Sequence, residues 1–392
     1  MIHIIIRTIQ IVSAMFALAG AGYYLVCLWS ARSYLRETRL RLQEHTALGV
    51  SLPPVSILKP LKGMDPQIYE SFRSHCDQDY PEEYEIIFGV SEPDDPAVAI
   101  VRRLQQEFPQ KRIELIVCSE RLGVNVKVSN LVQMLRSARY DTLLVNDSDI
   151  RVDPSYLRRV VTPLNNPRIG MVTCLYRGIA TATLGSCLEA LGISTDFAPG
   201  VLVARSMEGG VRFGLGSTLV FRRRELQAIG GFEALLDYLA DDYELGKRIH
   251  DLGRRVELSE TVVETFLPAY SLTNFFQHQL RWGRAIRDSR RGGYIGLLFT
   301  FGLPWSLLAA IANYREIWAW VLLAVVAILR AVVALVVGGR VLGDQQVLGW
   351  LFILPLRDLL AVLVWIASFG GNTINWRGDA FTLKNGRLVQ RS

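Results

Sequence analysis

The sequence predicts an α/β domain with a parallel, doubly wound sheet, set between apolar segments long enough to cross a membrane. Three observations lead to this prediction. Apolar runs of strand length alternate with helical stretches from about residue 50 to residue 290, which is the pattern of a sheet covered by helices. A charge-free apolar run, Ile9 to Trp29, comes before this region, and further apolar stretches follow it. One strand-length run ends in Asp147 and Asp149, at the kind of strand end where α/β proteins bind ligands.

The apolar ends account for a hydrophobic content of 50% in a chain of 392 residues, which is high for a soluble protein. The first run lacks a small-residue cleavage site and therefore predicts a retained anchor rather than a signal peptide. The later stretches span 294–312, 317–337 and 347–369. Pro304 divides the first of these, which leaves open whether it crosses the membrane, re-enters or lies at the interface. Arg330 and Asp358 lie inside the other two, and we expect them to contact each other because an unpaired charge in a bilayer is costly.

The net charge is +6, and arginines are concentrated beside the apolar segments. Basic residues next to membrane spans mark the cytoplasmic side and attract anionic lipid. We therefore expect a membrane as their partner and no nucleic acid, because the sequence has no nucleic-acid recognition motif. The tail is also basic, with Arg377, Lys384, Arg387 and Arg391 against Asp379. If all four apolar stretches cross, the tail lies outside; its positive charge favours the cytoplasm instead.

Four strands are predicted in the first half of the domain, at Val55–Leu61, Glu85–Val90, Ile113–Cys118 and Thr142–Val145. Asp65 is predicted to cap the helix after the first strand, with the following proline at its first position. Asp94 and Asp95 stand at the start of the next helix. The carboxyl ends of parallel strands meet at one edge of a sheet, so we expect these two aspartates to converge with Asp147 and Asp149 on one crevice.

The second half of the domain departs from this alternation. Its predicted elements are strands at 170–176 and 217–223, a loop at 195–200 and helices at 241–252 and 275–291. Asp241 and Asp242 begin the first of these helices, where the helix dipole favours negative charge. The second helix interleaves arginines with aromatic residues, which is typical of an amphipathic helix on a membrane surface.

These predictions divide the chain into five parts. They are an N-terminal transmembrane anchor with a basic linker at 1–49, a cytoplasmic α/β domain at 50–270, an interfacial helix region at 271–293, C-terminal membrane segments at 294–369 and a basic tail at 370–392.

The spacing of Asp147 and Asp149 allows both carboxylates to face outward where the chain turns after the strand. Carboxylates are the hard oxygen ligands that Mg²⁺ or Mn²⁺ prefers. Such an ion holds a diphosphate and neutralises the charge of a leaving group. The alternative is a polar turn that closes a strand.

Five motifs occur in the order found in ceramide glucosyltransferases. They are Lys59-Pro-Leu-Lys-Gly-Met-Asp65-Pro, Asp94-Asp95-Pro96, Asn146-Asp147-Ser148-Asp149, Ala240-Asp241-Asp242-Tyr243 and Arg281-Trp282. The chain resembles this family over about 50–290 and in the arrangement of its apolar ends. The resemblance implies a membrane-anchored, inverting glycosyltransferase with a GT-A fold, a Rossmann-like domain that binds a nucleotide sugar.

The resemblance also implies roles for the acidic residues of the later motifs. Asp147 and Asp149 would bind the metal, Mg²⁺ or Mn²⁺, and through it the diphosphate. Asp242, with Asp241 beside it, would be the general base that takes the proton of the acceptor hydroxyl. The choice between Asp241 and Asp242 is open.

Donor-binding residues are implied at two further places. Asp95, with Asp94 beside it, would contact the nucleotide, although a helix cap explains it as well. Lys127 and Asn130 resemble a donor-contacting pair, and the alternative for them is a solvated helix face.

The last motif implies a group that closes over the donor. Arg281 has the fork of donors that suits a diphosphate, and Trp282 can cover the face of a sugar ring. Both residue types also favour membrane interfaces, which is the alternative. His278 stands where the family has Gln or Arg, and a histidine can still donate a hydrogen bond to a phosphate.

Stretches 69–76, 184–200 and 212–216 are similar to a bacterial branch of the family associated with hopanoid synthesis. This resemblance implies transfer of N-acetylglucosamine from UDP-GlcNAc to the lipid bacteriohopanetetrol at a bacterial inner membrane. A ceramide glucosyltransferase that uses UDP-glucose is the alternative. A processive polysaccharide synthase is less expected, because it needs more spans, and a catalytically inactive scaffold would not retain the clustered carboxylates.

Overall fold

The computed structural model describes residues 1–47, 51–376 and 379–390. The chain forms two compact units. Unit 1 comprises Met1–Glu37, Ala182–Val203 and Ala269–Asn385, and unit 2 comprises Thr38–Thr181, Ala204–Pro268 and Gly386–Ser392. The predicted boundaries of the α/β part, 50–270, differ from unit 2 chiefly at 182–203, which belongs to unit 1. The five-part division remains a prediction.

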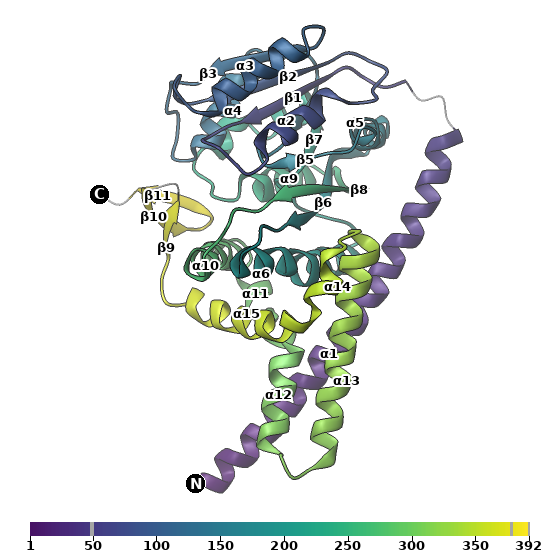
Figure 1. The fold of residues 1–392 in the computed structure, drawn as a ribbon, viewed down its shortest axis with the longest axis vertical. Coiled ribbons are helices and arrows are strands. Elements are labelled where there is room, and N and C mark those ends of the chain that lie inside the picture. Colours follow the sequence, from purple (N-terminus) through teal and green to yellow (C-terminus); the bar gives the residue numbers. More distant parts are fainter. Residues whose placement is uncertain (48–50, 377–378, 391–392) are drawn as a thin grey trace. The chain divides into compact units, whose positions relative to one another are not determined.

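Unit 2 is built on an eight-stranded sheet with the order β3-β2-β1-β4-β7-β6-β8-β5 (Figure 1). Its strands are β1 Val55–Pro60, β2 Tyr84–Val90, β3 Arg112–Val117, β4 Thr142–Val145, β5 Ile150–Arg151, β6 Ile169–Ile179, β7 Leu219–Arg222 and β8 Arg255–Phe266. β1 runs parallel to β2 and β4, and β2 runs parallel to β3. β7 is antiparallel to both of its neighbours, β4 and β6. The predicted parallel sheet is therefore confirmed for the first four strands, whereas the whole sheet is mixed.

The central strands form where the sequence is continuously apolar. Every residue of β1, β2 and β4 is buried, as expected of strands covered by helices on both faces. Phe72 and Phe88 meet in the core with ring centroids 4.7 Å apart. β8 was not predicted, because Glu, Ser and Thr interrupt its apolar residues and leave no regular alternation.

The helices of unit 2 are α2 Ile68–Cys76, α3 Ala97–Glu107, α4 Val126–Leu135, α5 Tyr156–Val161, α8 Arg223–Ala228 and α9 Asp241–Asp251. The predicted cap at Asp65 is wrong. α2 begins two residues later than expected, with Gln67 at the N-cap in the left-handed region at φ 54°. Asp65 instead accepts a hydrogen bond from the Ser148 hydroxyl, so this carboxylate ties the loop after β1 to the turn after β4.

Unit 1 is mostly helical. Its helices are the N-terminal part of α1 Ile2–Ala47, then α6 Leu184–Gly192, α10 Leu272–Ser289, α11 Arg291–Gly296, α12 Gly302–Ala312, α13 Ile317–Val333, α14 Gln346–Trp350 and α15 Leu354–Ser368. α7 Ala198–Met207 begins in this unit, and β9 Thr373–Trp376 pairs antiparallel with β10 Asp379–Lys384.

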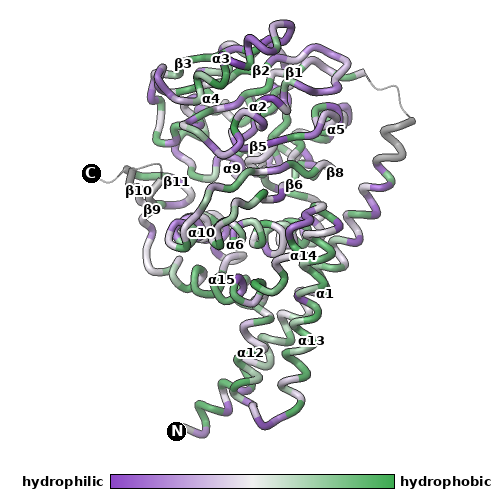
Figure 2. The backbone as a smooth tube through the Cα atoms, in the orientation of Figure 1, coloured by the Kyte–Doolittle hydropathy of each residue, from purple (hydrophilic) through white to green (hydrophobic). Residues whose placement is uncertain are grey.

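Four helices in the described part of the chain are long and apolar enough to cross a membrane, or five if a bent pair counts as one span. The four are His3–Arg41, Leu184–Met207, Ile317–Val341 and Gln346–Ser368. Figure 2 shows hydrophobic residues along much of α1 and α13. The bent pair, Arg291–Phe299 with Gly302–Ala312, turns by 42°. This is the predicted 294–312 stretch, and its break falls just before Pro304.

The predicted loop at 195–200 is wrong, because the chain is helical there. Ile193–Phe197 is a π-helical segment that joins α6 to α7. Pro199 has no N–H to donate to the carbonyl of Thr195, four residues earlier. Arg330 donates to that carbonyl instead, over 2.7 Å. The Pro-Gly pair looked like a loop signal, and the partner that satisfies the freed carbonyl lies too far along the sequence to be predicted.

Helix packing in unit 1 depends on two glycines. A Cβ on Gly20 of α1 would lie 2.2 Å from the Cα of Gly302 at the start of α12, so only glycine permits this approach. Phe16 stacks on Phe299 and Trp305 nearby, with ring centroids 5.1 and 4.8 Å apart. Close backbone contact through small residues is a common way for apolar helices to associate.

The end of the C-terminal tail is part of unit 2. β11 Arg387–Gln390 belongs to that unit, and its Leu388 N–H donates to the carbonyl of Asp237 over 2.7 Å. Arg387 also donates to the Tyr238 hydroxyl over 3.2 Å. Two of the basic tail residues, Arg377 and Arg391, lie outside the described residues. The end of the tail therefore shares a unit with the sheet.

We expect this tail to lie on the cytoplasmic side. The end of the tail belongs to the unit that carries the sheet, and we expect that unit in the cytoplasm. Lys384 is exposed, so Lys384→Cys should stay unlabelled when intact cells are treated with a membrane-impermeant maleimide. It should label after the cells are permeabilised. Labelling in intact cells, above the level of the wild-type chain, would place the tail outside.

Candidate active site

Buried polar side chains hold the turn after β4. Asn146 is fully buried; its amide donates to the Ser217 carbonyl over 2.6 Å, and its Oδ1 lies 3.1 Å from Nε2 of His75. The Lys59 ammonium, also fully buried, donates to the Asp147 carbonyl over 3.0 Å. Burial lowers the pKa of Lys59 to about 7, against the opposing effect of Asp149 and Asp147. These contacts hold the turn in place.

Lys127 joins two of the predicted site residues. Its ammonium lies 2.7 Å from Oδ1 of Asp147 and 3.2 Å from Oδ2 of Asp241. Burial by itself would lower the pKa of Lys127, but the carboxylates of Asp147, Asp241 and Asp242 outweigh it and raise the pKa. Lys127 is therefore a fixed cation between the strand-end aspartates and the start of α9.

Asp149 is the second strand-end carboxylate. Its Oδ2 accepts a hydrogen bond from the Thr265 hydroxyl of β8 over 2.5 Å. Burial, with the neighbouring charge of Asp147, raises the pKa of Asp149 to about 6. The two carboxylates repel each other, and a cation placed between them would relieve this repulsion.

Asp242 lies beside the same group. Its Oδ2 accepts the Gly216 N–H over 2.7 Å, and its Oδ1 accepts the Tyr243 N–H over 2.8 Å. A Cβ on Gly216 would come within 2.9 Å of Oδ2 of Asp147 and 3.2 Å of Oδ2 of Asp242, so the two carboxylates flank this glycine. Burial and the charge of Asp241 raise the pKa of Asp242 to about 6, although Lys127 acts to lower it.

Asn125 is a site residue that sequence reasoning missed. It is the N-cap of α4, where its Oδ1 accepts the Val128 N–H over 3.2 Å. Its amide donates to the Tyr238 carbonyl over 2.7 Å and lies 3.4 Å from Oδ1 of Asp241. Asn125 thereby contacts both the helix that carries Lys127 and the side chain of Asp241. An asparagine two residues before a predicted helical lysine is a cap signal that could have identified it.

Asp95 and Asn130 contact the segments that follow β1 and β2. Asp95 accepts the N–H of Gly63 and the N–H of Ala97, each over 2.9 Å, so it holds the loop after β1 to the start of α3. The buried Asn130 accepts from the Ser91 hydroxyl over 3.1 Å. Asp94 is exposed. The donor contacts of these residues remain predictions.

His278, Arg281 and Trp282 belong to unit 1, on α10. Three and four residues apart, they share one face of the helix. The rings of His278 and Trp282 have centroids 6.0 Å apart. The predicted helix at 275–291 is confirmed as α10, which ends at Ser289.

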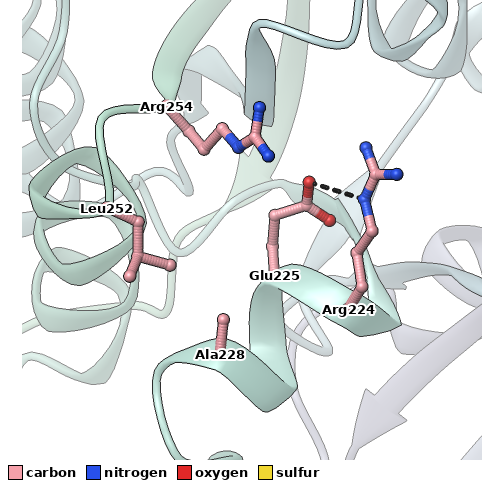
Figure 3. Close-up of a pocket in the computed structure, with 5 residues that line it drawn as sticks. All are labelled: Arg224, Glu225, Ala228, Leu252 and Arg254. Carbon is pink, nitrogen blue, oxygen red and sulfur yellow. Dashed lines mark hydrogen bonds and ion pairs between the residues drawn. The ribbon is translucent and has the colours of Figure 1, made fainter.

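A pocket elsewhere in unit 2 contains none of the predicted site residues. It is lined by Arg224, Glu225, Ala228, Leu252 and Arg254 (Figure 3). It adjoins α8, which follows β7, and β7 runs antiparallel to β4 with Arg222 beside Thr142. The pocket therefore lies toward the start of β4, whereas the aspartates follow its end. Its carboxylate, Glu225, already pairs with Arg224 over 3.1 Å.

The strand-end carboxylates fit a divalent metal that shares its ligands with a substrate. The described residues contain no group of three or more His, Cys, Asp or Glu side chains able to enclose an ion. Mg²⁺ commonly takes one or two protein carboxylates and completes its coordination with phosphate oxygens and water. Asp147 and Asp149 could supply such a pair of oxygen ligands.

A sequence profile of glycosyl transferase family 21 matches residues 12–389. The chain belongs to this family. It is accordingly a sugar-transferring enzyme, and the predicted likeness to ceramide glucosyltransferases is confirmed.

Curated relatives of this chain are named ceramide glucosyltransferases. Ceramide glucosyltransferase 3 of Caenorhabditis elegans is 25% identical over 388 residues, which cover 91% of this chain and 78% of the relative. Ceramide glucosyltransferase 1 of the same organism is 24% identical over 367 residues, covering 90% and 76%. The long apolar helices are consistent with a membrane protein.

The fold also has a solved counterpart. A mannosyltransferase from Pyrobaculum calidifontis, determined with GDP-Man and Mn²⁺, superposes with a TM-score of 0.54 at 19% identity, covering 91% of this chain and 99% of that one. At this identity the likeness concerns the fold alone. The predicted GT-A glycosyltransferase fold is confirmed.

Proposed function

We propose that this family 21 enzyme transfers one sugar from a UDP-sugar to a hydroxyl of a membrane lipid, with inversion at the anomeric carbon. The observation that supports this most is the cluster at the end of β4, where Lys127 bridges Asp147 and Asp241 and Asp242 lies beside them. Sugar transfer from a nucleotide diphosphate requires a held diphosphate and a base for the acceptor hydroxyl. The cluster offers both kinds of group.

Asp242 is better suited than Asp241 to the role of base. Asp241 is already engaged by the Lys127 ammonium and the Asn125 amide. The pKa of Asp242 is raised to about 6, so near neutral pH this carboxylate is ionised yet more basic than an ordinary aspartate. It takes the hydroxyl proton as the hydroxyl oxygen attacks C1 from the face opposite the diphosphate, which inverts the anomeric centre.

Asp147 and Asp149 would hold Mg²⁺ or Mn²⁺. When bound, the ion supplies positive charge that neutralises the departing diphosphate. Lys59 and Asn146 hold the turn that carries these two aspartates, and Thr265 donates to the Asp149 carboxylate. Arg281 and Trp282 remain the predicted donor-closing residues, and Asp95 a predicted nucleotide contact.

Removing the charge of Lys127 should shift the pH dependence of the reaction. Because Lys127 lowers the pKa of Asp242, Lys127→Met should raise that pKa. The base must be ionised, so kcat/KM in the wild type should fall below about pH 6, and in the variant the fall should begin at higher pH. Lys247→Met, which alters an exposed lysine of α9 paired with Asp251, is the control. If kcat/KM falls at the same pH in Lys127→Met as in the wild type, Lys127 does not influence the pKa of the base.

Two acceptors fit this proposal. The names of the curated relatives favour ceramide as acceptor and glucose as the sugar. The likeness of 184–200 and 212–216 to the hopanoid-associated branch favours a polyhydroxylated hopanoid and N-acetylglucosamine. Both lipids keep an apolar body in the membrane and present a hydroxyl at headgroup depth, which is the depth at which an amphipathic helix such as α10 would lie.

The test is a competition in nanodiscs that contain the purified protein. UDP-glucose and UDP-GlcNAc are offered together with ceramide and bacteriohopanetetrol, and UDP release and lipid products are measured. Transfer of a single sugar to either lipid supports the proposal and identifies the substrate pair. UDP release that requires no lipid, or a product of many sugars, contradicts it, and a chain with no turnover would be a scaffold.

A further inference from the structure

A network of charged and polar side chains joins five elements of unit 1. It connects α6, the π-helical segment 193–197, α10, α13 and α15, and we call it the charge network; its members are Glu189, Asp196, His278, Gln279, Arg330, Arg357 and Asp358. All of these elements except α10 belong to helices that are apolar enough to cross a membrane. Charged side chains in such surroundings are costly unless paired, and they usually serve a function.

Arg330 anchors one end of the network. Its Nε and Nη2 donate to the two oxygens of Asp358 over 2.9 and 2.6 Å, so the predicted contact is confirmed as a bidentate pair. Nη2 also donates to Oδ1 of Asp196 over 2.6 Å, and Nη1 donates to the Thr195 carbonyl that Pro199 leaves without its usual donor. This end fixes α13 to α15 and to the π-helical segment.

Arg357 carries the network to α10. Its Nη2 lies 3.3 Å from Oδ2 of Asp196 and donates to Oε1 of Gln279 over 3.1 Å. A Cβ on Gly192 would lie 2.5 Å from this nitrogen, so the guanidinium rests directly on the backbone of α6. Gln279 in turn donates to Oε2 of Glu189 over 2.9 Å.

Glu189 connects the network to His278, the residue that departs from the family motif. It is buried, and its Oε1 lies 3.3 Å from Nδ1 of His278. One carboxylate therefore holds two consecutive residues of α10. Tyr270 stacks on the other side of His278, with ring centroids 5.3 Å apart.

His278 and Gln279 lie on the turn of α10 that precedes Arg281 and Trp282. His278 shares a helix face with both and contacts Trp282. Phe197, next to Asp196 in the π-helical segment, also meets Trp282, edge to face with centroids 6.3 Å apart. Trp282 is thus contacted from both ends of the network, while 40% of it stays exposed.

We propose that Glu189 and Arg357 are positioning residues, which fix the face of α10 that carries Arg281 and Trp282 and thereby set the affinity for the sugar donor. Glu189 and Arg357 tie this face of α10 to α6 and α15 through Gln279 and His278, and these contacts hold it in one orientation. The proposal rests on the proposed function, in which Arg281 and Trp282 bind the donor. A network that only stabilises the helices predicts no effect on donor affinity in folded variants.

The test measures the Kd for UDP-sugar by titration calorimetry, without acceptor, on the full chain in nanodiscs. Glu189→Ala and Arg357→Gln should each raise the donor Kd about tenfold, because a displaced helix face misplaces its contacts. Glu189→Gln should raise it about threefold, because it keeps an acceptor for Gln279 and loses the charge that faces His278. The KM for the lipid acceptor should not change.

A double variant shows whether Glu189 acts through Arg281. Adding Glu189→Ala to Arg281→Ala should raise the donor Kd by a smaller factor than Glu189→Ala does in the wild type, because only the contact of Trp282 is left to lose, whereas fully additive losses would overturn the proposal. Glu316→Gln, an exposed acid of the same unit, is the control and should match the wild type.

A donor Kd within about twofold of the wild type in folded Glu189→Ala would also overturn the proposal. If this variant does not fold, the same limit is applied to the donor Kd of Glu189→Gln. A wild type that binds the donor but transfers no sugar contradicts the proposed function and leaves this comparison intact.

Discussion

Replacing Asp242 by Asn should lower kcat by about 10²-fold or more while the Kd for the UDP-sugar stays nearly unchanged. The amide keeps the shape of the side chain but cannot take the proton of the acceptor hydroxyl. The measurement combines steady-state kinetics with donor titration on the purified protein.

Two further variants interpret this result. Asp251→Asn alters an exposed acid at the other end of α9 and should leave kcat unchanged. Asp241→Asn should weaken the contact with Lys127 and lower kcat less than Asp242→Asn. Near-normal turnover by Asp242→Asn together with a large loss in Asp241→Asn would transfer the role of base to Asp241.

Removing divalent metal should abolish sugar transfer, and adding Mg²⁺ or Mn²⁺ should restore it. Asp149→Ala should raise the donor Kd about tenfold or more. The metal then loses one of its two protein ligands, and the diphosphate binds through the metal. Asp153→Ala is the matched control, since Asp153 is an exposed acid of the same region that accepts from Ser155. Full activity in excess chelator would remove the metal from the mechanism.

The parts of the fold that the sequence predicts are those set by local pattern. β1, β2 and β4 are apolar runs of strand length, and the aspartates after β4 follow directly from where that run ends. The contact of Arg330 with Asp358 was also predictable, because two opposite charges in apolar stretches have few other ways to be neutralised.

The parts that were missed depend on partners far along the sequence. The helix continues through Pro199 because Arg330, in another helix, donates to the Thr195 carbonyl. Asp65 binds Ser148 rather than its own helix. At the site, Gly216 and Thr265 act through contacts with aspartates that no local pattern connects to them. Sequence reasoning identified the acidic residues but could not show that Lys127 bridges two of them.

Lipid mass spectrometry tests the central claim most directly. Lipids are extracted from cells that lack the gene and from the same cells complemented with the wild-type chain or with Asp242→Asn. We predict a membrane lipid heavier by one sugar in the wild-type cells, with its sugar-free form accumulating in the other two. Identical lipid profiles in all three, or a sugar found only on a polymer, would contradict the assignment of this protein as a lipid glycosyltransferase.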